Sequence, residues 1–243
     1  MAEMTVLELT QEFCRRQGLP APSSVVTSQD DAILQIFGLL NEGVMDLTDR
    51  YHWQQLLQRV SFYHGGGANY AAIDFSSTYT DFHALIPNTL WDTTNRMPVN
   101  GPISAEQWTA MIHMGVAAAL YNFRLYGNAL RIYPAPSTLT DVLFAMEYLS
   151  NFGAYDATSA ANARQYVDDA SYPRLPSNII LADLRWRWRQ AKGLPYAEDQ
   201  RICEEAIMNA VGREPLPALS MHEPDLGQAV GPGLLVAAGS WPL

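Results

Sequence analysis

The chain has 243 residues, of which 48% are hydrophobic and only 16% charged, and its formal net charge is −10 at pH 7. That length can hold one large domain or two small ones, and either could bury a core of its own. Proteins that bind nucleic acid neutralise phosphates mainly with Lys and Arg, so 15 basic residues against 25 acidic ones argue against sequence-specific binding of DNA or RNA.

Cysteine usage and hydropathy narrow the class further. Cys14 and Cys203 lie far apart in the sequence, which favours two reduced thiols over a disulfide framework. The N-terminal sequence MAEMTVLELTQEF is acidic and amphipathic, unlike a signal peptide, and no run of about 18 apolar residues could span a membrane, so we expect no membrane partner. Low charge with 6 Trp and 12 Tyr fits either a subunit with extensive contacts to other subunits or a tyrosine-rich core.

The first part of the chain is predicted to be helical. Thr5 and Glu8 form the S/T-x-x-E capping pattern, and apolar residues then recur at helical spacing until Gly18. A second helix is predicted from Ser28, with Asp31 as the acidic partner in its capping box. One face of this second helix is apolar for about five turns, which predicts the core of a helical bundle. The residues of that face are Ile33, Ile36, Phe37, Leu40, Val44, Leu47 and Tyr51.

Residues 58–150 show the pattern of strands, and we expect them to form an antiparallel β domain inserted into the helical frame. QRVSFYHGGGANYAAIDF is predicted to be a hairpin with a glycine-rich tip; no Lys-Ser/Thr follows the glycines, so they do not indicate a phosphate-binding loop. A second hairpin is predicted in LYNFRLYGNALRIYPAPS, with its turn at Gly127-Asn128, and TDVLFAMEYLS is predicted to add a strand to the same sheet. Ser104 and Gln107 predict a short capped helix between them.

The helical frame is predicted to resume after a polar loop at 151–170. Ser177 is expected to cap a helix that runs to Gly193, and Pro195 to begin another that ends near Val211. The frame would therefore comprise residues 1–57 and 171–211.

Residues 212–243 have no periodic face and are rich in Pro and Gly, yet they contain LLVAA. This composition predicts an extended arm that becomes ordered on a partner, and a terminal remnant without structure is the alternative. The predicted fold class is α+β: a helical bundle frame, an inserted small antiparallel β domain and an extended C-terminal arm.

Residues suited to catalysis or metal binding do not form a known motif. The five histidines show neither HxxxH nor HExxH spacing, and GxSxG is absent. We therefore predict no catalytic residue, no metal and no cofactor, and expect that the chain is not an enzyme. A carboxylate pair for glycoside hydrolysis stays open, with Glu147 as the first candidate, although an outward-facing Glu on an alternating strand is the commoner case.

The segment LADLRWRWRQAKGLPYAEDQ concentrates basic and aromatic residues in an acidic chain. In a helix, Arg185 and Arg189 would flank the apolar face on one side and Arg187 on the other, whereas Trp186 and Ile179 would point away from the local core. Because apolar groups then lie on two opposite sides, the pattern favours a helix clamped between its own domain and a neighbour over a membrane-active helix. A larger core that surrounds the helix is the alternative.

Four blocks of sequence follow one another over most of residues 4–211. They are TVLELTQEFCRRQGLPAPSSVVTSQDDAILQIFGLLNEGVMDL, LWDTTNRMPVNGPISAEQW, YGNALRIYPAPS and LPSNIILADLRWRWRQAKGLPYAEDQ. In their order and spacing these blocks resemble the head-to-tail connector (adaptor, head-completion) proteins of tailed bacteriophages.

The resemblance implies a structural virion protein that is assembled in the host cytoplasm and lies at the head-tail interface. Such proteins form a ring, typically of twelve copies, that joins the portal to the tail or nozzle protein and lets DNA pass through its channel without sequence-specific binding. The segment with RWRWR would then lie at contacts between subunits, made by Arg185, Trp186, Arg187 and Arg189. The C-terminal arm would grip the portal through Leu234, Leu235, Val236, Trp241 and Leu243.

A second hypothesis is a cell-wall-directed particle protein, either carbohydrate-binding or lytic. Its β domain would use Trp91, Trp108 and tyrosines as stacking platforms, with Glu147 as the carboxylate. A membrane-perturbing protein acting through residues 185–189 is a third hypothesis.

Overall fold

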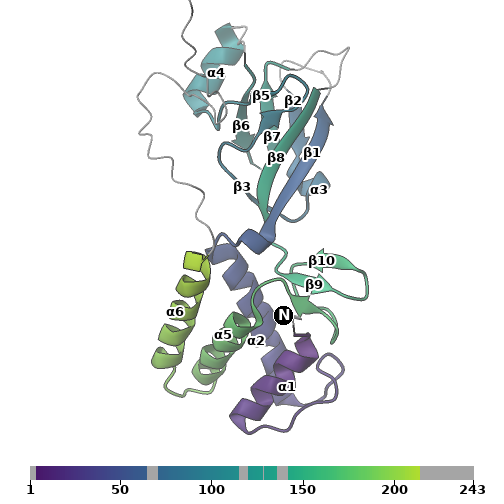
Figure 1. Ribbon diagram of the computed structural model, residues 1–243, viewed down its shortest axis with the longest axis vertical. Coiled ribbons are helices and arrows are strands. Elements are labelled where there is room, and N and C mark those ends of the chain that lie inside the picture. The colour runs from purple at the N-terminus through teal and green to yellow at the C-terminus, as the bar shows by residue number, and fades with distance from the viewer. Residues whose placement is uncertain (1–3, 65–70, 115–119, 128, 136–141, 214–243) are drawn as a thin grey trace, which may run out of the picture.

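Helices from the two ends of the described chain gather at one end of the molecule, and strands from its middle gather at the other (Figure 1). The computed structural model describes residues 4–64, 71–114, 120–127, 129–135 and 142–213. Helices and several small antiparallel sheets are both present, so the predicted α+β class is confirmed. The predicted arm anchors Leu234, Leu235, Val236, Trp241 and Leu243 lie outside the described residues.

The helical body is built from segments on either side of the strands. Its helices are α1 (Val6–Gln17), α2 (Asp31–Arg50), α5 (Ser177–Ala191) and α6 (Ala197–Arg213). The capping box predicted for α1 is confirmed: the Thr5 hydroxyl accepts a hydrogen bond from the Glu8 N–H at 3.2 Å, and the Glu8 carboxylate accepts one from the Thr5 N–H at 2.9 Å. This reciprocal pair satisfies two backbone donors that the first turn of a helix leaves free.

Two helix starts differ from the prediction, in addition to that of α6, which begins at Ala197 and not at Pro195. Helix α2 begins at Asp31 because its capping residue is Asp30 and not Ser28. The Asp30 carboxylate accepts a hydrogen bond from the backbone N–H of Ala32 at 2.9 Å. Ser177 is the first residue of α5 and not its cap; Pro176 precedes it and contributes no side-chain hydrogen bond. Both helices are nevertheless present where their apolar periodicity predicted them.

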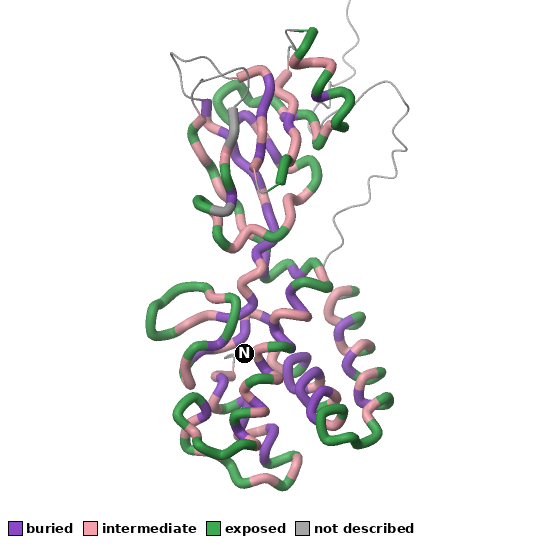
Figure 2. Tube along the Cα trace, turned by 180° about the vertical axis from the view of Figure 1, so that it is seen from behind, coloured by how far each residue is buried: buried purple, intermediate pink, exposed green. Residues whose placement is uncertain are grey.

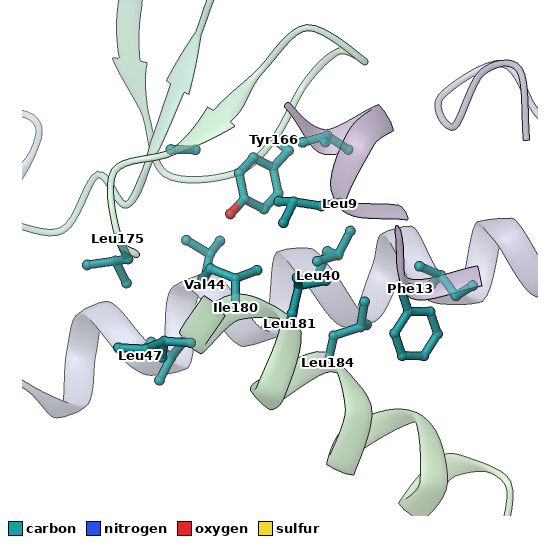
Figure 3. Packing of buried hydrophobic residues seen from close by; sticks show 14 of the residues in the cluster. Leu9, Phe13, Leu40, Val44, Leu47, Tyr166, Leu175, Ile180, Leu181 and Leu184 are labelled. Atoms are coloured by element: carbon teal, nitrogen blue, oxygen red, sulfur yellow. The ribbon is translucent and has the colours of Figure 1, made fainter. Parts of the chain in front are cut away.

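Apolar side chains of α1, α2 and α5 meet between these helices (Figure 3). The predicted face of α2 is buried at Ile33, Ile36, Leu40, Val44 and Leu47, whereas Phe37 and Tyr51 are half-buried. Phe13 of α1 packs edge-on against Trp188 of α5, with the ring centroids 5.8 Å apart. Burial of each large side chain stabilises the fold by roughly 1.5–3 kcal/mol, so this face holds α2 between its neighbours.

The β body contains two small antiparallel sheets. In the first, the spatial order is β1 (Leu57–His64), β8 (Val142–Ser150), β4 (Trp91–Asp92) and β5 (Met97–Pro98), and β3 (Phe82–Leu85) also pairs with β8. In the second, the order is β2 (Ala71–Asp74), β7 (Ala129–Tyr133) and β6 (Asn122–Tyr126). The remaining elements are η1 (Gln54–Leu56), α3 (Phe75–Thr78) and α4 (Ala105–Met114). Buried residues are found in both bodies (Figure 2). Their side chains form two clusters, and the cluster of the β body includes residues of both its sheets.

Two predicted strand pairings are wrong. Strands β1 and β2 pair with different partners: β1 pairs with β8 from Leu57↔Leu149 to His64↔Val142, and β2 pairs with β7. Strand β8 also belongs to the sheet of β1, not to that of the hairpin β6–β7. An eight-residue register between β1 and β8 offers more cross-strand contacts than a four-residue hairpin would, so long-range pairing outweighs the local glycine signal. The hairpin predicted over β6 and β7 and the cap of α4 by Ser104 and Gln107 are confirmed.

Residues 151–170 contain strands as well as the predicted polar loop. Strands β9 (Ala154–Asp156), β10 (Ala161–Ala163) and β11 (Tyr172–Pro173) form a third sheet next to the helical body (Figure 1). The chain that follows β10 is tied to the loop between α1 and α2, because the Asp169 carboxylate accepts from the N–H groups of Val25 and Val26, each at 2.9 Å. In the described ranges, no helix combines the length and the apolarity that crossing a bilayer requires.

Candidate functional site

Arg187, one of the four predicted subunit contacts, is buried inside the helical body. Its guanidinium forms ion pairs with Asp183 at 2.7 Å, with Glu42 at 2.9 Å and with Asp46 at 2.7 Å. Burial alone would lower the pKa of Arg187, but these carboxylates raise it above its ordinary value. The side chain therefore stays charged and joins α5 to α2.

Arg185 and Arg189 join α5 to α6. Both contact the buried carboxylate of Asp199, Arg185 at 2.9 Å and Arg189 at 2.6 Å. The two guanidiniums stay partly exposed, whereas the side chain of Asp199 is only 4% exposed. These arginines thus hold the two last helices together, and their predicted role between subunits stays a prediction.

Trp186 and Ile179 were predicted to point away from the local core. For Ile179 this is wrong: Ile179, Ile180 and Leu181 are all buried, because the core surrounds the first turn of α5. Trp186 is half-buried, and its indole N–H donates to Asp183 at 3.0 Å. These interactions lie within one chain, so the predicted contact of Trp186 with a neighbouring subunit stays a prediction.

A separate pocket of about 460 Å³ opens on the first sheet of the β body. Its lining includes Arg59 of β1, Glu147 of β8, Trp91 and Asp92 of β4, and the turn residues Asn88 and Arg96. Strand register brings these residues together, since Arg59 lies opposite Glu147 and Trp91 lies opposite Ala145. The volume lies within the range of small-ligand sites.

The turn between β4 and β5 places Arg96 at the rim of this pocket. The buried Asp92 carboxylate accepts from the backbone N–H of Asn95 at 2.9 Å and from its side-chain amide at 2.6 Å. Asn88 and Arg96 both have left-handed backbone conformations, with φ of 61° and 59°. Asn tolerates this conformation well, whereas for Arg it is uncommon.

The structure brings together only some residues of the carbohydrate hypothesis. Trp91 and Glu147 meet in the pocket, but Trp108 is buried on α4, where its ring packs edge-on against Tyr133 at 6.3 Å. Arg59 and Arg96 were not predicted from the sequence, because their positions depend on the long-range β1–β8 register and on the Asp92 turn. The D-T-T-N-R spacing after Trp91 was the one local signal that could have pointed to that turn.

No metal centre is evident in the described ranges: no three or more His, Cys, Asp or Glu side chains are grouped so as to hold an ion. A scan of the chain against protein-family models gives no match, and neither does a search among curated proteins.

Proposed function

We propose that the chain is a subunit of a head-to-tail connector ring in a tailed bacteriophage, located in the virion between the portal and the tail. The observation that carries the proposal is the distribution of exposed apolar side chains on the helical body. Ile202 and Met208 on α6 are 43% and 65% exposed, and Val26, in the loop between α1 and α2, is 39% exposed. Helix α6 and this loop lie on opposite sides of the helical body in both views (Figures 1 and 2).

A ring needs this kind of arrangement. A cyclic assembly closes through a heterologous interface, in which one surface of each subunit contacts a different surface of the next. Helix α6, with two exposed apolar side chains, and the loop on the opposite side, with Val26, fit that requirement. The sequence resemblance to connector proteins favours it independently. The net charge of −10 per copy would keep passing DNA from adhering to the channel wall.

The proposal also assigns partners. Copies of the chain contact one another, a portal protein lies above the ring and a tail or nozzle protein lies below it. The arm that begins near residue 212 contacts the portal through the apolar residues predicted above.

Native mass spectrometry of the purified chain, alone and mixed with portal particles of the same virus, tests the assembly. We expect one saturating multi-copy stoichiometry on the portal. A chain that binds portal in no defined number, or not at all, would refute the connector function. Removal of residues 214–243 should abolish portal binding while the far-ultraviolet circular dichroism of the helical body stays unchanged.

Complementary variants test the heterologous interface. Ile202→Asp on α6 and Val26→Asp on the opposite loop should each prevent ring formation, since each removes one of the two surfaces. A mixture of the two variants retains one intact interface and should therefore give dimers that neither variant forms alone. Met97→Asp, on the exposed surface of the β body, is the control and should leave the ring intact.

A second candidate is a particle protein that binds surface carbohydrate, because Trp91 and Glu147 share one pocket. Cleavage is not supported, since the other carboxylate among the described lining residues, Asp92, is buried and hydrogen-bonded within its turn. The geometry therefore favours binding over hydrolysis.

A further inference from the structure

Two arginines that make no ion pair or hydrogen bond with the described residues line the pocket on the β body. Among the arginines whose side chains the structure describes, Arg59 and Arg96 alone make no ion pair, hydrogen bond or ring contact with another described residue. Both line the pocket. Because the other arginines with described side chains, and Lys192, each have a partner, this placement in an acidic chain indicates an anionic ligand.

The backbone at Arg96 strengthens this reading. With φ at 59°, glycine would occupy the position without steric cost, whereas an L-side chain there is less favourable by about 1 kcal/mol. Folding alone therefore favours Gly at position 96. A contact between the guanidinium and a ligand would offset this cost, although a positive φ is not by itself a mark of binding, since Ala160 has one as well.

The other pocket residues indicate what carries the anionic group. Trp91 is half-buried and Glu147 is half-buried, and neither side chain hydrogen-bonds to another described residue. A half-exposed indole is a flat surface on which a sugar ring can stack, and a carboxylate accepts hydrogen bonds from sugar hydroxyls. The lining carries two arginines and two carboxylates, Glu147 and the buried Asp92, so its formal charges cancel. Because the Asp92 carboxylate is bonded to Asn95 within its turn, the two arginines face one accessible carboxylate, which suits a ligand with a single carboxylate better than a phosphate dianion.

We propose that this pocket binds an acidic saccharide, that is, a pyranose ring bearing a carboxylate. Trp91 stacks on the ring, Arg59 and Arg96 bind its carboxylate, and Glu147 accepts from its hydroxyls. This inference deepens the carbohydrate-binding candidate and is independent of the connector function. It commits to a glycan, because Glu147 and the overall charge oppose the phosphates of nucleic acid.

The test uses the full chain and three probes: tri-galacturonate, its methyl ester and the neutral tri-galactose. Isothermal titration calorimetry should show that tri-galacturonate binds at least about tenfold more tightly than either neutral probe. This difference corresponds to the loss of one charge-assisted contact. Equal affinity for the acid and its ester would leave the carbohydrate candidate standing but overturn the role of the arginines. Absence of binding to all three probes would overturn both.

Variants separate binding from folding. Arg96→Gly should weaken binding of tri-galacturonate about tenfold while its melting temperature equals or exceeds that of the parent chain, because glycine suits the left-handed conformation. Trp91→Ala should weaken all binding, and Arg15→Gln, an exposed change on α1, should alter none. An Arg96→Gly chain that binds as tightly as the parent would overturn the assignment.

Discussion

Gly43 occupies a position on α2 where any side chain would strike the buried ion pair of α5. A Cβ atom at this residue would lie 2.3 Å from Oδ2 of Asp183 and 3.6 Å from Nε of Arg187. That carboxylate cannot move aside freely, because Asp183 is only 3% exposed and accepts from Arg187 at 2.7 Å and from Trp186 at 3.0 Å. We therefore expect Gly43→Ala to destabilise the helical body.

The magnitude follows from two opposing effects. Separating a buried ion pair costs roughly 3–5 kcal/mol, and the lower end applies because Arg187 keeps Glu42 and Asp46 as partners. Alanine in a helix interior is more favourable than glycine by about 1 kcal/mol. The expected net loss in the free energy of unfolding is about 2 kcal/mol.

Gly38, on the same helix, is the matched control. A Cβ atom there would meet nothing within 4 Å, so Gly38→Ala should raise the free energy of unfolding by up to about 1 kcal/mol. Urea unfolding followed by circular dichroism at 222 nm, which reports mainly on the helices, measures both variants. If Gly43→Ala proved as stable as Gly38→Ala, the reasoning about the Asp183 contact would be refuted.

Two further predictions concern ionisable groups. Burial raises the pKa of Cys203 to about 12 and also raises that of Cys14. Since the thiolate is the reactive form, neither thiol should react with dithionitrobenzoate at pH 8 until the chain is unfolded. Rapid reaction of one equivalent in the folded chain would contradict this. Hydrogen bonds from Thr158 and, to a smaller extent, Ser171 hold the pKa of Asp168 below its usual value of 3.8. The ionised carboxylate therefore stabilises the fold above pH 3.8, and this stabilisation is lost as the pH falls through the lowered pKa. Asp168→Asn should accordingly be less stable than the parent chain at pH 6, by a margin in urea midpoint that narrows at pH 3; a constant margin would count against it.

Local signals predicted the helices and one hairpin well. The capping pairs at Thr5 and Ser104 and the period of α2 act within a few residues, so sequence alone reveals them. The β6–β7 turn is equally local. The wrong strand predictions concern choices between distant partners: β1 pairs with β8 across the whole insertion, and no local pattern reveals that preference.

In the candidate site, too, residue type could be read from the sequence but long-range proximity could not. Trp91 and Glu147 could be singled out by residue type, but their meeting with Arg59 depends on strand register. Arg187 was predicted from its helical face, yet its partners Glu42 and Asp46 belong to α2, far away in the sequence. A side chain that sequence analysis assigns to a surface can therefore be buried by a segment that the local pattern does not identify.

The paired entry and exit of the β body make it an exchangeable module. The chain leaves the helical body through β1 and returns through β8, and Leu57 and Leu149 are opposite each other at the junction. Paired strands lie about 5 Å apart, so a tight turn could join them there and leave α2 and α5 in place. If the proposed functions hold, recombination at this one point would exchange the glycan-binding pocket without altering the helices assigned to the ring.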